Sequence, residues 1–214
     1  MVGPRACYAR AMDPKAHWER VYQTKTANQV SWYRPHLDVS LDLITKTVTD
    51  RDARIVDVGG GEATLVDDLL DAGYMHVDVL DLSATALQVA RDRLGEAAGA
   101  VGWLHGDVTT YPFAADHYDL WHDRAVFHFL TDATQRQRYV QQVVRAVKSG
   151  GHVIVATFGP EGPTRCSGLE VIRYDADSLH DQFGPRFELV EHSIEEHETP
   201  SGLRQQFVYC MCRT

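Results

Sequence analysis

The sequence predicts an α/β fold with a mostly parallel sheet and helices on both of its faces. Short β-branched segments alternate with amphipathic segments over residues 54–157, an order that makes successive strands parallel. A glycine turn, Gly59–Gly61, follows the first of these strands. Two strands near the C-terminus are joined by a Pro- and Gly-containing turn at residues 199–202, which is typical of an antiparallel hairpin.

Local signals set the bounds of each expected element. Leu37, Leu41 and Ile44 form one apolar stripe, which predicts a helix before the sheet. Ser83 is a candidate N-cap, and Gly95 a candidate end, for a later helix. The expected strands are residues 54–58, 76–80, 101–105, 117–121, 152–157, 187–195 and 204–212. The other expected helices are residues 64–72, 83–94, one beginning at Thr131 or Asp132, and 175–183, while residues 159–168 are expected to form a loop.

Length and charge narrow the class of protein. The chain has 214 residues, about the size of one domain, and its hydrophobic share of 44 % is ordinary for a globular protein. Asp and Glu number 30 against 21 Lys and Arg, so the net charge is −9 with neutral histidines. Such an acidic surface repels a phosphate backbone, and we expect no nucleic-acid partner.

Residues 1–12 are expected to be a flexible tail, followed by a single domain over residues 13–214. Within it, residues 13–50 are expected to form a lid and the first helices, and residues 54–212 the sheet. No apolar run approaches the roughly 20 residues of a membrane span, and the four cysteines are too few and too unevenly spaced for a disulfide framework. We therefore expect a cytoplasmic monomer or homodimer without a membrane partner.

The polar residues at the strand ends indicate a ligand site, because ligands of such sheets bind beyond the carboxyl ends of the strands. Asp57 stands at the end of the first strand, where glycines let the backbone approach a ligand closely. Asp81 ends the second strand and is placed to accept hydrogen bonds from ribose hydroxyls; its alternative role is to cap the next helix. Asp107 follows the third strand, either as an acceptor for an adenine amino group or as part of an ordinary turn.

Four segments in order resemble the class I S-adenosylmethionine-dependent methyltransferases: the run Asp57–Ala63, the terminal Asp81, Gly106 with Asp107, and the Ser149–Gly151 turn. The resemblance covers about residues 15–212, and Ala63 replaces the family's last motif glycine. It implies a seven-stranded Rossmann-like sheet, the cofactor S-adenosyl-L-methionine and the product S-adenosyl-L-homocysteine. The cofactor-binding residues that it implies are Trp32, Asp57, Gly59, Gly60, Gly61, Asp81, Leu82, Asp107, Val108 and His122.

The N-terminal segment is similar to the lid of a small bacterial-type subgroup that includes small-molecule enzymes and relatives of the elongation-factor lysine methyltransferases. Aromatic rings from such a lid attract a sulfonium charge and exclude water. The alternative is that Trp18, Tyr22, Trp32 and Tyr33 only pack the first helix onto the sheet.

The residues after the fourth strand flank the methyl group in this family. His122, Asp123 and His128 are therefore the candidate catalytic residues, as general bases. Alternatively, Asp123 pairs with Arg124 to hold the turn and His128 is a core histidine. The lysine methyltransferase relatives carry Asp-Lys-Gly where this chain has Asp123, Arg124 and Ala125.

The expected substrate-binding residues are Tyr22, Tyr33, Arg124, Arg165 and Cys166, of which the last two lie in the loop after the fifth strand. A packed loop with a structural Cys166 is the alternative. The histidines show no metal-binding spacing, so no metal is expected.

Three functions fit these observations. The first is methyl transfer to a small-molecule acceptor at an O, N, S or soft metalloid nucleophile. The second is methylation of a protein lysine, and the third is a cofactor-binding sensor without catalysis. The altered Asp-Lys-Gly position and the long loop over residues 159–168 favour the first.

Overall fold

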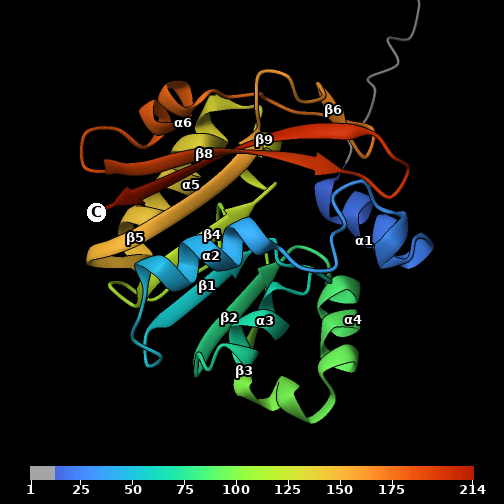
Figure 1. The fold of residues 1–214 in the computed structure, drawn as a ribbon, viewed down its shortest axis with the longest axis horizontal. Coiled ribbons are helices and arrows are strands. Elements are labelled where there is room, and N and C mark those ends of the chain that lie inside the picture. Colours follow the sequence, from blue (N-terminus) through green and yellow to red (C-terminus); the bar gives the residue numbers. More distant parts are fainter. Residues whose placement is uncertain (1–12) are drawn as a thin grey trace, which may run out of the picture.

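The computed structural model describes residues 13–214 and confirms the predicted α/β fold (Figure 1). Its seven-stranded sheet has the order β3-β2-β1-β4-β5-β9-β8. Strands β1 to β5 pair in parallel, whereas β9 pairs antiparallel with both β5 and β8. The strands of this sheet are β1 (Arg54–Val58), β2 (His76–Asp81), β3 (Val101–His105), β4 (Tyr118–Arg124), β5 (Val147–Phe158), β8 (Glu188–Glu198) and β9 (Arg204–Arg213). The flexible tail predicted for residues 1–12 lies outside the described residues.

Six α-helices surround the sheet within residues 13–214, and Figure 1 shows α2 and α5 on opposite sides of it. Apolar side chains of α2 and α3, such as Ile44 and Leu65, pack against one face, and side chains of α5 and α6, such as Tyr139 and Leu179, pack against the other. The α-helices are α1 (Pro14–Thr24), α2 (Asp38–Thr47), α3 (Leu65–Asp71), α4 (Ala84–Leu94), α5 (Ala133–Ala146) and α6 (Ala176–Phe183). Three short 3-10 helices, η1 (Ala27–Gln29), η2 (Gly95–Ala100) and η3 (Phe127–Phe129), complete the described part.

Strand β4 is longer than the sequence predicts, because it continues through Arg124. Its polar residues are poor strand formers, but β1 and β5 pair with it on both sides and satisfy its backbone. Alternation along the strand then sends neighbouring side chains to opposite faces. His122 and Arg124 share the face covered by α2, whereas Asp123 shares the α5 face with Trp121.

The loop predicted for residues 159–168 contains part of a small hairpin, so the prediction was wrong there. Strands β6 (Arg165–Cys166) and β7 (Leu169–Glu170) pair antiparallel. Ser167 and Gly168, which join them, have φ angles of 48° and 79°, as a two-residue type I′ turn requires. The Ser-Gly pair was the available signal, but the strands are too short to show an alternating pattern.

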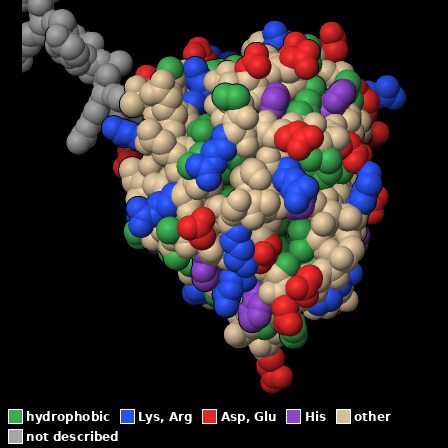
Figure 2. Space-filling view, turned by 90° about the vertical axis from the view of Figure 1, so that its left-hand side faces the viewer, with side chains coloured by type: hydrophobic (Ala, Val, Ile, Leu, Met, Phe, Trp, Pro, Cys, Tyr) green, Lys and Arg blue, Asp and Glu red, His purple; other side chains and the backbone are tan. Residues whose placement is uncertain are grey.

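The N-terminal lid lies at one end of the sheet, where α1 packs against α4 (Figure 1). Glu19 of α1 accepts a hydrogen bond from Ser83 Oγ at 2.7 Å and another from Thr85 Oγ1, both at the start of α4. The predicted N-cap role of Ser83 is confirmed, since its Oγ accepts from the backbone N–H of Ala86 at 3.2 Å. The end of the molecule turned away from α1 shows acidic, basic and histidine side chains intermingled (Figure 2).

Candidate functional site

A cavity of about 550 Å³ opens at the carboxyl ends of β1 to β4, beneath the lid. Its walls come from α1, the lid segment around Trp32, the turns after the strands, and the β6–β7 hairpin. The lining residues that the argument uses are Trp18, Tyr22, Trp32, Gly59, Asp81, Leu82, Asp107, Val108, Arg124, Ala125, Val126, Phe129, Arg165, Cys166 and Glu170. This is the edge of the sheet at which the sequence predicts a ligand site.

The glycine turn after β1 has no room for side chains. Of its three glycines, Gly59 lines this cavity, Gly60 borders only a smaller hollow beside it, and Gly61 lines neither. Gly59 and Gly61 have φ angles of 70° and 51°, a region that favours glycine. A Cβ on Gly59 would lie 2.0 Å from Val126 Cγ2, and one on Gly61 would lie 2.9 Å from Tyr22 Oη and 3.2 Å from Asp81 Oδ2. The turn therefore exposes backbone directly beneath the lid, as a cradle for a ligand requires.

Asp81 stands at the end of β2 with its carboxylate at the cavity. Its Oδ1 accepts from the backbone N–H of Ser83 at 2.7 Å. Burial raises the pKa of Asp81 to about 7, and the carboxylates of Asp57 and Glu19 add to the shift while the backbone N–H groups of Ser83 and Leu82 oppose it. The carboxyl group lines the cavity and does not cap α4, whose N-cap is Ser83.

Asp107 and Val108 line the cavity after β3. Asp107 Oδ1 accepts from both the backbone N–H and the hydroxyl of Thr109, at 2.8 and 2.7 Å. These bonds fix the carboxylate at the rim. Leu82 supplies an apolar wall between the ends of β2 and β3.

A smaller hollow of about 50 Å³ adjoins the cavity and shares Tyr22, Trp32, Gly59 and Arg124 with it. Glu62 borders this hollow and is only 7 % exposed, yet its Oε1 has no hydrogen-bond partner among residues 13–214. Burial raises the pKa of Glu62, and the Arg93 guanidinium opposes the shift. An unpartnered buried carboxyl oxygen beside a cavity fits a ligand that carries a donor or a positive charge.

Aromatic rings from the lid close the cavity. The Trp18 ring meets the Trp32 and Phe129 rings edge-on, with centroids 5.7 and 5.0 Å apart. Tyr22 meets Trp32 edge-on at 6.3 Å. Trp18, Tyr22 and Trp32 line the main cavity, whereas Tyr33 borders only the smaller hollow. The rings thus both line the cavity and pack with one another.

The far wall of the cavity carries the residues predicted to bind a substrate. Arg165 and Glu170 face each other across the β6–β7 hairpin, and both line the cavity. Cys166, also in the lining, is 6 % exposed, and burial raises the pKa of its thiol to about 11. Arg124 borders both the cavity and the hollow.

The three residues predicted to be catalytic lie outside the lining of the main cavity among residues 13–214. Asp123 is fully buried and accepts from the backbone N–H groups of Val126 and Phe127 and from Tyr139 Oη. His128 Nδ1 accepts from the backbone N–H of Phe158 at 3.2 Å, and burial lowers the pKa of this histidine to about 3. Both residues thereby hold the turn after β4 in place.

His122 borders the smaller hollow and lies beneath the glycine turn. Its Nδ1 is 2.7 Å from Asp57 Oδ1, and its Nε2 is 2.9 Å from Ser40 Oγ. Asp57 Oδ1 and His122 Nδ1 share one hydrogen bond, so the pair ties β4 to the end of β1. This pairing across adjacent strands, Asp57 opposite His122, follows from the parallel register.

The sequence analysis missed several lining residues, among them Glu62, Thr109, Phe129, Thr131 and Gln135. Glu62 lies inside the glycine motif, but nothing in its spacing distinguishes it from a surface residue. Phe129 lies in the 3-10 helix η3 after β4 and Thr131 follows it, and no periodic pattern in the sequence predicts so short a helix. No helix within residues 13–214 is both long and apolar enough to cross a membrane.

Comparisons with known proteins agree with this geometry. A family model described as a methyltransferase domain matches residues 55–151. The ubiquinone/menaquinone biosynthesis C-methyltransferase UbiE of Roseobacter denitrificans is 31 % identical over 108 residues, which are 49 % of this chain and 42 % of that protein. The eEF1A lysine and N-terminal methyltransferase of Bos taurus is 24 % identical over 139 residues, 64 % of this chain and 19 % of that protein. The chain thus spans less than half the length of these curated relatives.

Solved structures share the fold. A protein studied for the conversion of a disulfide bond into a thioacetal group during echinomycin biosynthesis superposes with a TM-score of 0.74 at 19 % identity, over 93 % of this chain and 92 % of its own. A SAM-dependent methyltransferase of Methanosarcina mazei gives a TM-score of 0.67 at 16 % identity, over 80 % of this chain and 96 % of its own. The matched domain and the relatives identify residues 55–151 as a methyltransferase domain, and the strand order of the described chain is shared with structures described as SAM-dependent methyltransferases.

Proposed function

We propose that this chain transfers a methyl group from S-adenosyl-L-methionine to a small-molecule acceptor. The observation that carries the proposal is the cavity beneath the lid, which is lined by Gly59, Asp81 and Asp107 at the strand ends and by Arg165, Cys166 and Glu170 of the β6–β7 hairpin. When bound, the cofactor supplies an electrophilic methyl group that an acceptor lone pair takes by in-line displacement, which leaves S-adenosyl-L-homocysteine.

The residues beyond the strand ends fit the cofactor. Asp81 offers its carboxylate to the two ribose hydroxyls, and Asp107 offers an acceptor to the adenine amino group, beside the apolar Leu82 and Val108. The unpartnered Oε1 of Glu62 offers an acceptor to the ammonium of the amino-acid end. Each of these roles uses an atom on the cavity or on the hollow that joins it.

The walls position the acceptor and exclude water, and they provide little for proton removal. No histidine lines the main cavity within residues 13–214. Burial raises the pKa of Cys166 to about 11, and burial together with Asp81 and Glu62 raises that of Tyr22 well above its usual range. The proposal therefore favours an acceptor that is already nucleophilic near neutral pH. In this proposal His122, Asp123 and His128 support the structure of the site and do not act as the general bases that the sequence predicts.

A protein lysine is the competing acceptor, in view of the likeness to the eEF1A methyltransferases. A lysine ammonium must lose a proton before it attacks, and no histidine lines the main cavity within residues 13–214 to accept that proton. The Asp-Lys-Gly of the lysine methyltransferase relatives is also replaced by Asp123, Arg124 and Ala125 in this chain. These two features support the small molecule.

Two measurements test the proposal in sequence. Calorimetry with S-adenosyl-L-methionine and S-adenosyl-L-homocysteine is expected to show binding, and no binding at about millimolar ligand would overturn the methyltransferase proposal. Incubation of labelled cofactor with an extract of the native host is then expected to place label in the small-molecule fraction. Label in the protein fraction alone would instead identify the protein-lysine activity, and label in neither would point to a sensor.

A further inference from the structure

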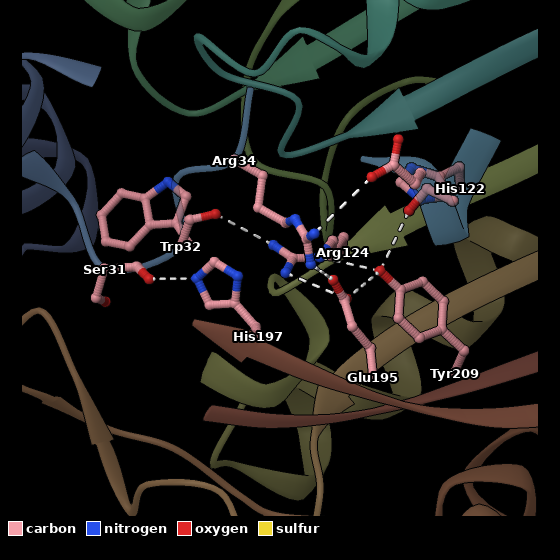
Figure 3. A network of polar contacts seen from close by, with 10 residues as sticks. Ser31, Trp32, Arg34, His122, Arg124, Glu195, His197 and Tyr209 are labelled. Carbon is pink, nitrogen blue, oxygen red and sulfur yellow. Dashed lines mark hydrogen bonds and ion pairs between the residues drawn. The ribbon is translucent and has the colours of Figure 1, made fainter. Parts of the chain in front are cut away.

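A buried ion cluster joins the lid to the C-terminal hairpin. Glu195 of β8 lies between two guanidinium groups, with its Oε1 2.5 Å from Arg34 Nη1 and its Oε2 3.4 Å from Arg124 Nη2 (Figure 3). The side chains of Glu195 and Arg124 are only 6 % and 5 % exposed, and that of Arg34 is 30 % exposed. Burial opposes ionisation of Glu195, but Arg124, Tyr209 and Arg34 outweigh it and lower the pKa of this carboxyl group. The carboxylate is thus held ionised between the lid and β4.

The same hairpin and β4 also hold the lid backbone directly. His197 Nε2 donates to the backbone carbonyl of Ser31 at 2.7 Å, and Arg124 Nη1 donates to that of Trp32 at 3.4 Å (Figure 3). Together with the side chain of Arg34, these contacts fix consecutive parts of the lid. The Trp32 backbone is therefore held in place, and its ring, which lines the cavity, packs edge-on against Trp18 and Tyr22.

The cluster continues to the glycine turn after β1. Tyr209 Oη donates to Glu195 Oε2 at 2.9 Å and accepts from Arg124 Nε at 3.0 Å. Tyr209 Oη also lies 3.4 Å from Ser40 Oγ, which is 2.9 Å from His122 Nε2, and His122 Nδ1 in turn meets Asp57. One polar chain therefore links the lid, the hairpin and the start of the glycine turn.

Packing alone does not account for this cluster. Three charged groups at an interface lose hydration, and apolar side chains of similar volume commonly stabilise such a site as well or better. Charge-assisted hydrogen bonds do give the fixed geometry that apolar contacts lack. In this cluster, the hydrogen bonds of Glu195 with Arg34 and Arg124 fix the position of the lid over the cavity.

We propose that Glu195 is a positioning residue for the methyl transfer: through Arg34 and Arg124 it holds Trp32 across the cavity, although Glu195 itself does not line it. This inference rests on the proposed function, because the lid matters only if the cavity takes the cofactor. Three segments far apart in sequence, around residues 31–34, 122–124 and 195–209, then act as one support for the site.

Arg34→Gln is the sharpest first test, because Arg34 is the most exposed of the three clustered residues and its loss leaves Glu195 paired with Arg124. The substitution also removes the 3.8 Å pair between Arg34 and the exposed Asp38 at the start of α2. We expect amide hydrogen exchange at Val30 and Tyr33, whose N–H groups donate to the carbonyls of Ala27 and Val30, to accelerate about tenfold in the ligand-free protein, with exchange in β1 to β5 unchanged. Affinity for S-adenosyl-L-homocysteine, measured by calorimetry, is expected to fall about tenfold, the effect of one charge-assisted hydrogen bond. Arg34→Lys keeps the charge and is expected to restore affinity to within about threefold of the wild type.

The controls separate positioning from folding. Glu195→Gln is expected to show the same two changes more strongly, and Glu198→Gln, the same substitution at an exposed site on the same strand, is expected to show neither. Wild-type exchange at Val30 and Tyr33, or wild-type affinity, in both Arg34→Gln and folded Glu195→Gln would overturn the inference. A wild-type protein that binds no cofactor would overturn the proposed function, and the inference would fail with it.

Discussion

The carboxyl ends of β2 and β4 each carry a buried aspartate, and the two differ in what surrounds them. Burial raises the pKa of Asp81 and of Asp123 alike, to about 7. Asp81 accepts a backbone hydrogen bond at Oδ1 and presents its carboxylate to the cavity. Asp123 accepts three hydrogen bonds from the turn after β4 and from Tyr139, and lies on the far face of the sheet from the lid.

The difference shows that a place at a strand end does not by itself make a residue part of a site. Strand β4 runs on through Arg124, so alternation decides which side each polar residue faces. Asp123 therefore serves the fold, in our interpretation, and Asp81 serves the ligand. Stability and affinity should separate the two roles.

The largest expected effect is the loss of stability in Asp123→Ala. The substitution leaves the N–H groups of Val126 and Phe127 and the Tyr139 hydroxyl without an acceptor in a dry environment. We expect the free energy of unfolding to fall by about 3–5 kcal/mol, measured by urea denaturation. A loss below about 1 kcal/mol would show that Asp123 does not hold the turn.

Asp81→Ala should show the reverse pattern. Two hydrogen bonds to ribose hydroxyls are lost, so the affinity for S-adenosyl-L-homocysteine is expected to fall about 30- to 1,000-fold, or about 2–4 kcal/mol. The free energy of unfolding should change by about 1 kcal/mol or less, because one backbone hydrogen bond at a cavity wall is removed. Calorimetry of the folded variant measures the first quantity, and wild-type affinity would show that Asp81 only shapes the turn to α4.

The pH dependence of cofactor affinity is a smaller test of the difference between Asp81 and Asp123. Ribose hydroxyls bind the ionised form of Asp81, whose pKa in the free protein is about 7, so affinity should be highest above that pH and fall below it. We expect the dissociation constant of S-adenosyl-L-homocysteine to rise about five- to tenfold from about pH 8 to about pH 6. Asp81→Asn should remove this dependence, and a wild-type affinity that is flat over this range would contradict the assigned role.

Stability should respond to pH in the opposite sense. Both aspartates have folded-state pKa values raised above the unfolded value, so the native state binds more protons between about pH 4 and about pH 7. Their contribution to stability is greatest below the unfolded pKa and is lost as the pH rises through about 7. Asp123→Ala should reduce this slope in urea denaturation while leaving the pH dependence of affinity in place.

The sequence predicts the fold and the strand-end side of the cavity well, because both depend on local patterns. Short apolar strands, the glycine turn and the terminal Asp81 are contiguous signals, and each expected strand is present. The lid support could not be predicted in this way. Glu195 and Arg34 meet only after β8 folds back beside the lid, and an alternating strand with a charged residue facing inward looks in sequence like an ordinary exposed strand.

The end of β4 was misjudged for a related reason. The polar residues after Trp121 suggested that the strand stops there, whereas pairing with β1 and β5 on both sides extends it by three residues. His128 then falls on a 3-10 turn whose histidine faces the core. How many strands pair with β4 depends on the whole sheet, so the local sequence cannot predict where β4 ends.

The smallest expected effect concerns Ala125, which lines the cavity directly after β4. Its φ angle of 74° lies in the left-handed region, where a Cβ costs about 1 kcal/mol or more. Ala125→Gly removes this strain but gives the unfolded chain more freedom, so we expect a net gain of roughly 0.5–1 kcal/mol in the free energy of unfolding. Because the backbone N–H of Ala125 still donates to Ala156 at 2.9 Å, the turn should keep its shape and the affinity for S-adenosyl-L-homocysteine should stay within about twofold. A stabilised variant with much weaker binding would instead mean that the Ala125 methyl group contacts the ligand, and the strain would then belong to the site and not only to the turn.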